Sequence, residues 1–234
     1  MKYLKYFQEE SEYTGYKSST SYVVPNVSYV VSTNGIYYEA PVITPNNEIW
    51  YTSTDDNIVT PYSATVFGAN IVSNTYENGK GIILFDGDVT TIGGYAFKNC
   101  TSLTSINIPD GVDEIGMYTF SDCINLTSIT IPDSVLTIGK HAFNSCKNLT
   151  SVTIGNSVTS IGDSAFHWCN NLEHVYCKPT IPPTLYDRRV FNDVNGYVYA
   201  TFYVPKESVE AYSNTGHWKS LLQQSTVTIV GYDF

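Results

Sequence analysis

A 23-residue repeat in the middle of the chain constrains the fold more than any other feature of the sequence. Four copies align, and five residue types recur in each copy. They are Ile92, Ile115, Ile138 and Ile161; Gly93, Gly116, Gly139 and Gly162; Phe97, Phe120, Phe143 and Phe166; Cys100, Cys123, Cys146 and Cys169; and Leu103, Leu126, Leu149 and Leu172. A fixed period of roughly 20 to 50 residues indicates a solenoid, in which each repeat buries its apolar face only against its neighbours. The repeat therefore predicts a β-rich solenoid, a fold that presents binding surfaces more often than it catalyses.

Each repeat predicts two strands and a tight corner. Residues 152–154 alternate apolar and polar, as a strand with one buried face does, and residues 135–138 predict a shorter second strand. Phe143 and Cys146 are three residues apart, which predicts one turn of 3₁₀ or α helix with both side chains inward. The glycine after each recurring isoleucine either takes a positive φ or lets the backbone turn tightly into the next side of the coil. The recurring Ile, Phe, Cys and Leu are expected to stack as interior columns.

The cysteines follow the repeat and not a disulfide framework. The chain has five, an odd number, and four of them occupy one repeat position. We therefore expect reduced, buried thiols that pack as small apolar groups. His167, Cys169, His174 and Cys177 lie close in sequence, but their spacing is not that of a known pair of zinc knuckles. No metal and no cofactor is predicted.

The flanking segments predict caps for the two ends of the solenoid, which would otherwise expose its core and its strand edges. The expected domains are a small N-terminal β-hairpin module at 1–44, an N-terminal cap at 45–88, the solenoid at 89–178 and a C-terminal cap at 179–234. In the N-terminal module we expect a helical turn over 9–16, a strand over 22–31 and an Asn34-Gly35 turn to a strand over 36–38.

The two caps have their own strand and helix signals. Residues 48–60 predict one hairpin and residues 70–85 a second. Ile83 and Phe85 lie one period before Ile106 and Ile108, so the strand over 81–85 is expected to be the first rung. The C-terminal cap is predicted as a strand over 199–204, a helix over 208–221 and a strand over 226–230.

Charge and composition exclude several function classes. The net charge is −10 and no basic run occurs, which argues against nucleic acid and anionic membranes as partners. No stretch approaches the roughly 18 apolar residues of a membrane span, and the first residues show no signal peptide. Solubility comes largely from Ser, Thr, Asn and 20 Tyr, a composition that suits extracellular contacts. We find no G-x-S-x-G, H-E-x-x-H or phosphate-binding glycine loop, so no enzyme and no catalytic residue is predicted.

Two sets of surface residues are candidates for ligand binding. The first set points outward from the longer predicted strands and forms hydroxyl rows that end in one aromatic rung: Ser128, Thr130, Ser151, Thr153, His174 and Tyr176. These side chains could bind a glycan or a peptide, or they could form an ordinary solvated sheet face. The second set varies between copies at the predicted corner: Tyr95, Tyr118, His141 and the nearby Trp168. Those positions could form a recognition surface or an unconstrained one, and Trp168 could instead pack against the C-terminal cap.

The repeat resembles a known family. The segments Ile92-Gly93 to Leu103 and Ile131-Pro132-Asp133-Ser134-Val135 resemble the BspA-like leucine-rich repeats of bacterial surface proteins, and the resemblance runs from about Val89 to Cys177. The stretch from Val204 to Trp218 is similar to the element that closes such arrays. Thr119 and Gly155 depart from the pattern, which usually has Ala and Pro there. The resemblance implies a parallel β solenoid, adhesion or partner recognition, and no catalytic residues.

The N-terminal segment resembles a second group of proteins. Residues 6–17 and 25–29 are similar to the openings of phage-encoded virion proteins from gut anaerobes. Virion proteins leave the cell by lysis and need no signal peptide, which fits the absence of one here.

The sequence thus predicts a non-enzymatic recognition or adhesion protein at an extracellular surface or in a virion. The solenoid is expected to bind a cell-surface glycan or protein, residues 1–44 to anchor the chain in a larger assembly, and the chain could oligomerise. The alternative is a structural spacer or decoration protein without an external ligand.

Overall fold

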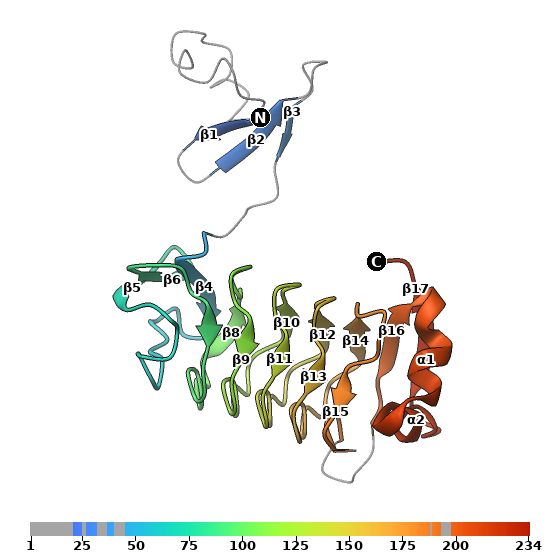
Figure 1. Ribbon diagram of the computed structural model, residues 1–234. Coiled ribbons are helices and arrows are strands. Elements are labelled where there is room, and N and C mark those ends of the chain that lie inside the picture. The colour runs from blue at the N-terminus through green and yellow to red at the C-terminus, as the bar shows by residue number, and fades with distance from the viewer. Residues whose placement is uncertain (1–20, 25–26, 32–36, 40–44, 188, 193–197) are drawn as a thin grey trace. The chain divides into compact units, whose positions relative to one another are not determined.

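The computed structural model describes residues 21–24, 27–31, 37–39, 45–187, 189–192 and 198–234 (Figure 1). The chain divides into two compact units, Met1–Ile43 and Thr44–Phe234. In the first unit β1 (Ser21–Val24), β2 (Val27–Val31) and β3 (Tyr37–Glu39) form an antiparallel sheet in that order. The predicted single strand over 22–31 is therefore wrong, because β1 and β2 pair with each other. The predicted Asn34-Gly35 turn and the helical turn over 9–16 lie outside the described residues.

The second unit is a coil whose successive turns stack as rungs (Figure 1). One side of the coil is a parallel sheet in the order β10-β12-β14-β16-β17, called the long sheet below. A second side is a parallel sheet of two-residue strands in the order β15-β13-β11-β9-β7. The long-sheet strands are β10 (Ser128–Ile131), β12 (Ser151–Ile154), β14 (His174–Cys177), β16 (Thr201–Pro205) and β17 (Thr228–Tyr232). The short strands are β7 (Thr91–Ile92), β9 (Glu114–Ile115), β11 (Thr137–Ile138), β13 (Ser160–Ile161) and β15 (Thr184–Leu185).

The third side of the coil is made of consecutive turns, so the predicted turn of helix is wrong. The amide of Cys146 does donate to the carbonyl of Phe143 at 3.3 Å, as in a turn. His141 and Ser145 take positive φ angles of 54° and 61°, however, and a right-handed helix cannot continue through them. The freed amides donate to the next rung instead. The amide of Phe143, for example, donates to the carbonyl of Ala165 at 2.7 Å.

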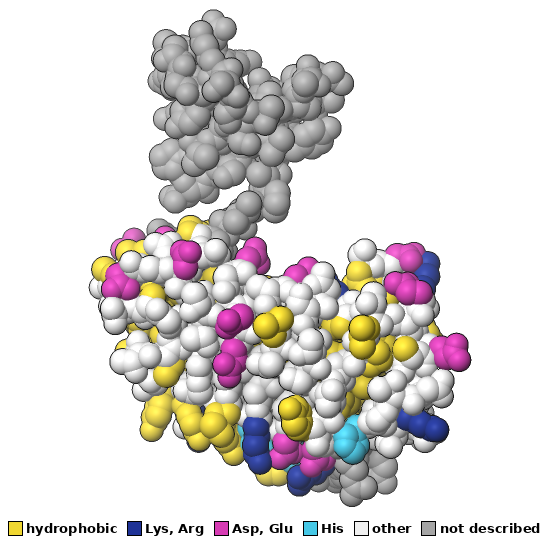
Figure 2. Space-filling view, viewed as in Figure 1, with side chains coloured by type: hydrophobic (Ala, Val, Ile, Leu, Met, Phe, Trp, Pro, Cys, Tyr) yellow, Lys and Arg dark blue, Asp and Glu magenta, His cyan; other side chains and the backbone are white. Residues whose placement is uncertain are grey.

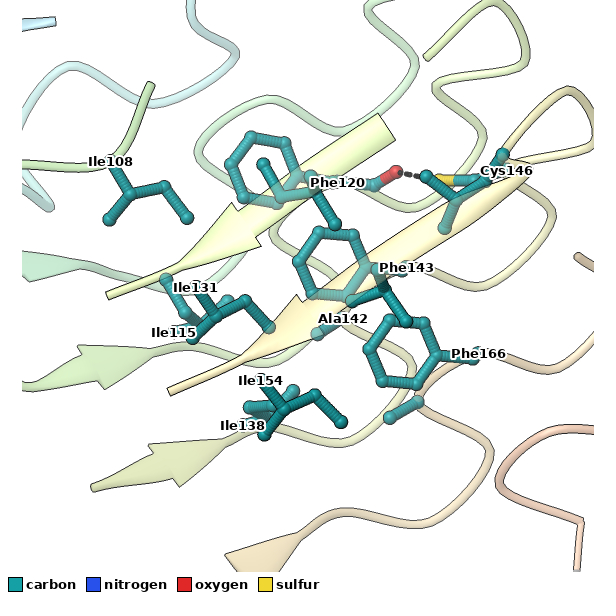
Figure 3. Packing of buried hydrophobic residues seen from close by; sticks show 14 of the residues in the cluster. Ile108, Ile115, Phe120, Ile131, Ile138, Ala142, Phe143, Cys146, Ile154 and Phe166 are labelled. Atoms are coloured by element: carbon teal, nitrogen blue, oxygen red, sulfur yellow. Dashed lines mark hydrogen bonds between the residues drawn. The ribbon is translucent and has the colours of Figure 1, made fainter. Parts of the chain in front are cut away.

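The core consists of the predicted interior columns (Figure 3). The recurring Ile, Phe and Leu side chains are buried in all four copies, and so are the last three of the four cysteines, whereas Cys100 is half-buried. Phe120 and Phe143 stack with ring centroids 5.1 Å apart, and Phe143 and Phe166 with centroids 5.0 Å apart. The column continues to Phe191, whose ring lies 5.2 Å from that of Phe166. The interior packing predicted from the period is thereby confirmed.

The recurring glycines are required by close contact between rungs. A Cβ atom on Gly116 would lie 2.4 Å from the backbone nitrogen of Gly94. On Gly139 it would lie 2.5 Å from the carbonyl carbon of Gly116, and on Gly162 it would lie 2.6 Å from that of Gly139. None of these three has a positive φ. Of the two explanations for the glycine column, the tight approach of the backbone is the one that applies.

The two departures from the repeat pattern also have local causes. Thr119 is buried, and its hydroxyl donates to the carbonyl of Gly116 at 2.8 Å. A Cβ atom on Gly155 would lie 2.2 Å from the carbonyl oxygen of Pro132 in the preceding rung, so this position accepts only glycine.

The N-terminal cap is an antiparallel sheet in the order β5-β6-β4-β8, made of β5 (Ile71–Glu77), β6 (Lys80–Phe85), β4 (Glu48–Ser53) and β8 (Leu103–Ile106). The predicted hairpin over 70–85 is confirmed, and Asn78 and Gly79 both take positive φ in its turn. The predicted hairpin over 48–60 is wrong, because β4 pairs with β6 and β8. The strand over 81–85 was expected to be the first rung, and this prediction is wrong, because β4 lies between β6 and β8.

Side chains replace the missing partner strand around Val59. This residue is buried, and its amide donates to the Tyr51 hydroxyl at 3.2 Å. Its carbonyl accepts a bond from the Asn74 side-chain amide at 3.0 Å. Because both backbone groups are satisfied in this way, the segment enters the core without forming a ladder.

At the C-terminal end the ladders continue past residue 178, the predicted end of the solenoid. β15 pairs with β13, and β16 and β17 extend the long sheet. The single helix predicted over 208–221 is divided into η4 (Lys206–Ser208), α1 (Val209–Asn214) and α2 (Gly216–Leu222). Trp218 of α2 is buried against the rings of Phe191 and Phe202, and its indole N–H donates to the carbonyl of Pro183 at 2.7 Å. These helices cover the end of the phenylalanine column. Among the described helices, none has the length and apolar character needed to cross a bilayer.

Candidate functional site

The outer face of the long sheet carries two rows of side chains. Alternate strand residues such as Ile129 and Val152 point into the core, and the residues between them point outward. Because the strands pair in register, outward residues align across the rungs. One row is Ser128, Ser151, His174, Thr201 and Thr228, and the other is Thr130, Thr153, Tyr176, Tyr203 and Val230. The sheet therefore presents hydroxyl groups on its first two strands and larger side chains on the next.

The outward rings at the C-terminal half of this face form one cluster, the aromatic patch, made of His174, Tyr176, Tyr203, Tyr232 and Phe234. Tyr176 and Tyr203 stack with centroids 4.5 Å apart and planes 13° from parallel. Tyr232 meets both of them edge-on, at 5.9 Å and 5.7 Å. The ring centroid of Phe234 lies 5.1 Å from that of Tyr232, and the ring centroid of His174 lies 5.9 Å from that of Tyr203. Four of these rings lie on the neighbouring strands β14, β16 and β17, and Phe234 follows β17 by two residues.

The aromatic patch is open to solvent, and its imidazole, that of His174, lies 3.9 Å from the carboxylate of Glu173. Tyr232 is 43% exposed and Phe234 is 52% exposed. The cations beside it are paired, Lys178 with Asp133 at 3.4 Å and Lys206 with Asp233. Uncharged side chains and backbone also make up most of the face of the molecule shown in Figure 2, where the charged side chains are scattered. Such a surface favours contacts made by apolar area and hydrogen bonds.

The turn side of the coil carries a separate column of rings. Tyr95 and Tyr118 stack at 5.2 Å, and Tyr118 and His141 stack at 4.7 Å. The ammonium group of Lys98 lies 5.4 Å and 5.3 Å from the two tyrosine rings, within range of a cation–π interaction. All three ring-bearing residues have positive φ, so the backbone of the turn ladder sets their direction.

Charged groups follow this column at its C-terminal end. Asp163 pairs with Lys140 at 2.9 Å and with Arg189 at 3.6 Å. Arg189 also pairs with Asp187 at 2.8 Å, and its hydrogen bonds lower the pKa of that carboxyl to about 2. Burial lowers the pKa of His141, because the imidazolium form is the more strongly hydrated one. His141 is therefore neutral at pH 7 and stacks as an uncharged ring.

Trp168 lies on the turn side, not on the long sheet. It is 42% exposed, its ring stacks on His167 at 5.1 Å, and its amide donates to the carbonyl of Asn192 at 2.9 Å. The predicted candidates thus fall into two groups. His174, Tyr176 and the hydroxyl rows share one face, while Tyr95, Tyr118, His141 and Trp168 lie on another side of the coil.

Sequence reasoning missed three members of the aromatic patch, namely Tyr203, Tyr232 and Phe234. Tyr203 follows Tyr176 at a step of 27 residues, not 23, so a search at the fixed period does not find it. The available signal was the alternation of Thr201 to Val204, which has the same inward and outward pattern as the repeat strands.

A metal centre finds no support in the part of the chain that the structure describes, where no three His, Cys, Asp or Glu side chains cluster suitably. Cys177, one of the residues considered above, is fully buried, and burial raises the pKa of its thiol.

Comparison with known proteins gives a family match. The model described as "BspA type Leucine rich repeat region" matches residues 53–195 in six copies. No curated protein matches the chain. Among solved structures, a leucine-rich repeat protein of T. pallidum is 27% identical, with a TM-score of 0.44, over 50% of this chain and 54% of that one. The pneumococcal vaccine antigen PcpA is 21% identical, with a TM-score of 0.38, over 60% of this chain and 38% of that one.

A leucine-rich cell surface protein of Faecalibacterium prausnitzii is 24% identical, with a TM-score of 0.34, over 68% of this chain and 40% of that one. The chain spans about half or less of the length of these three solved chains.

Proposed function

Because this chain belongs to the BspA-type leucine-rich repeat family, we propose that it is a non-enzymatic recognition module that binds a glycan or protein at a cell surface. The long sheet supplies the binding face, and the aromatic patch is its centre. The single observation that carries the proposal is this patch, in which four rings from three neighbouring strands and the ring of Phe234, just after β17, contact one another on the face of the long sheet.

Ordered tyrosines are well suited to binding. A tyrosine offers a large apolar ring with one hydrogen-bonding tip, and such residues dominate the energetics of many interfaces. Tyr176 and Tyr203 already stack on each other, so little side-chain freedom is left to lose when a ligand binds. The repeat scaffold beneath them is fixed by the buried columns.

The proposal extends to location and assembly. We place the solenoid outside the cell, at a bacterial surface or on a virion, and assign residues 1–44 as the anchor to the larger assembly. In support, contacts along the chain separate Met1–Ile43 from the rest as a unit of its own.

A structural role without an external ligand is the second candidate. It is favoured by open sheet edges: within the described strands, β5 ends the sheet of the N-terminal cap and β17 ends the long sheet, and each pairs on one side only. An unpaired edge can template assembly with another chain.

The test is capture of ligands by the full chain. Purified protein is presented to glycan arrays, to intact bacterial and host cells, and to their surface protein extracts. The double variant Tyr232→Ala/Phe234→Ala removes the exposed rings of the patch, and Tyr62→Ala, which removes an exposed ring elsewhere (72% exposed), is the matched control. Recognition predicts binding that the double variant loses and the control keeps. Absence of any glycan or protein ligand, together with ordered self-assembly of the full chain, would favour the structural role.

A further inference from the structure

We infer that the ligand of the long sheet is a neutral polysaccharide whose chain crosses the strands along the row of Thr130, Thr153, Tyr176 and Tyr203. This inference rests on the proposed function and names the class of ligand. Neighbouring strands are about 4.8 Å apart, and a pyranose unit of an extended polysaccharide is about as long as that spacing. A chain laid along the row would place successive sugars over successive strands.

The hydroxyl rows are available for such a ligand. Among the described residues, no protein hydrogen bond occupies the hydroxyls of Ser128, Thr130, Ser151 or Thr153. Thr150, the residue before β12, shows the contrast, because its hydroxyl donates to the carbonyl of Thr127 at 3.1 Å. A free hydroxyl is both donor and acceptor, as each sugar hydroxyl is, so the two rows can pair with a sugar in either sense.

The aromatic half of the row complements the other surface of a sugar. A pyranose ring has an apolar face of C–H groups, which packs on aromatic side chains. Because Tyr176 and Tyr203 stack on each other with planes 13° from parallel, a sugar laid over the row meets the edges of these rings and not the faces turned to each other. Tyr176 and Tyr203 stand side by side in the same row as Thr130 and Thr153, on the next two strands. One extended chain therefore meets hydroxyl groups on β10 and β12 and apolar rings on β14 and β16.

The charge distribution selects a neutral polymer. No position of either row is Asp, Glu, Lys or Arg. The nearest ammonium groups are held by carboxylates, Lys178 by Asp133 and Lys206 by Asp233. Recognition of sulfate or carboxylate groups needs cations that point at the ligand. Neither row carries Lys or Arg, and the imidazole of His174 lies 3.9 Å from the carboxylate of Glu173. A protein ligand remains an outcome of the test.

Titration of the full chain with soluble polysaccharides tests the inference. The neutral probes are a β-glucan, a mannan, a xylan and an arabinogalactan, and the anionic probes are polygalacturonate and dextran sulfate. The variants are Tyr203→Ala for the rings and Thr130→Val/Thr153→Val for the hydroxyls, which keeps the side-chain shape. Tyr62→Ala is the matched control, and thermal melts of each variant check the fold.

We expect at least one neutral probe to bind, with an affinity that is the same in 50 mM and 500 mM salt to within about twofold. Each row variant should weaken it by about tenfold or more, and the control should not. Binding of anionic probes alone, or loss of affinity at high salt, would overturn the inference. So would a protein ligand that depends on Tyr203 but not on the threonine hydroxyls, although that result would leave the recognition function standing.

Discussion

The thiol of Cys146 donates a hydrogen bond to the carbonyl oxygen of Phe120 in the preceding rung, with Sγ 3.1 Å from the oxygen (Figure 3). Cys123 and Cys169 make the same bond to Phe97 and Phe143, at 3.1 Å and 3.2 Å. The cysteine column is thus a polar seam beside the phenylalanine column. It explains why a small side chain with a weak donor recurs at this position.

Thiol reactivity should follow this arrangement. Burial raises the pKa of Cys100 to about 11 and keeps the other described thiols inaccessible. A chromogenic disulfide reagent at pH 8 should therefore label at most one thiol in the native protein and all five in denaturant. Rapid labelling of two or more thiols in the native protein would contradict the buried column.

Removal of one central ring should destabilise the whole array. Phe143 lies between two stacked rings and is completely buried. Phe143→Ala should lower the free energy of unfolding by about 3–5 kcal/mol, because it leaves a cavity that the rungs on either side cannot close. Denaturant melts measure this loss, with Tyr62→Ala as the exposed control, for which we expect a change within about 0.5 kcal/mol. A Phe143→Ala melt that superimposes on that of the parent would be inconsistent with the stack.

The glycine column should tolerate no side chain. In Gly139→Ala the new Cβ would lie 2.5 Å from the carbonyl carbon of Gly116, a backbone atom that cannot move aside. We expect a loss of about 1–3 kcal/mol or more. Gly87→Ala is the control, because its Cβ would meet only the Ala69 methyl group at 3.9 Å. Equal melting of the two variants would show that the rungs are not in contact at these glycines.

The ring column on the turn side should make stability depend on pH through His141. Its pKa lies below the ordinary 6.5 mainly because of burial, and the carboxylate of Asp163 opposes this shift only in part. The unfolded chain therefore binds the proton more readily, so stability is complete above about pH 6.5 and falls as the pH drops below it. The variant His141→Tyr carries a tyrosine at this position, as the preceding repeats do at Tyr95 and Tyr118. Between pH 7 and pH 5 the variant should lose less stability than the parent protein. Parallel pH profiles of the two melts would contradict this assignment.

The interior could be predicted from the sequence because the period itself encodes it. Residues that recur every 23 positions must occupy equivalent places in a stack, and the apolar ones can only be inside. The repeat also predicted the short strands, and it left two explanations for the recurring glycines. The repeat alone could not decide between a positive φ and a close backbone contact as the reason for these glycines. The contact of one glycine with Gly93 or Gly116 depends on how closely neighbouring rungs stack.

Two predictions that were wrong, the hairpin over 48–60 and the turn of helix in each repeat, depend on contacts that do not follow from the 23-residue repeat. β4 inserts between β6 and β8, a pairing that competes with the local hairpin and wins through long-range contacts. In the turns, residues such as Tyr118 and Trp168 take the left-handed conformation. Glycine is the residue that usually indicates this conformation, so a sequence without glycine at these positions does not predict it.

The candidate site was predicted in part for the same reason. His174 and Tyr176 lie within the regular repeats and were found. Tyr203 and Tyr232 lie beyond the 23-residue period, and the parallel pairing of β14, β16 and β17 brings them to the face of Tyr176. Phe234 reaches the patch through its contact with the ring of Tyr232.

Hydroxyl-radical footprinting of the tyrosines tests the central claim most directly, because it locates the bound ligand on the surface. The full chain is oxidised alone and with the neutral polysaccharide that binds most tightly in the titrations, and modified residues are identified by mass spectrometry. We predict that Tyr176, Tyr203 and Tyr232 are protected by the ligand while the exposed Tyr62 and Tyr186 are oxidised equally in both samples. Protection of Tyr95 and Tyr118, with the three patch tyrosines oxidised as in the free protein, would contradict the account.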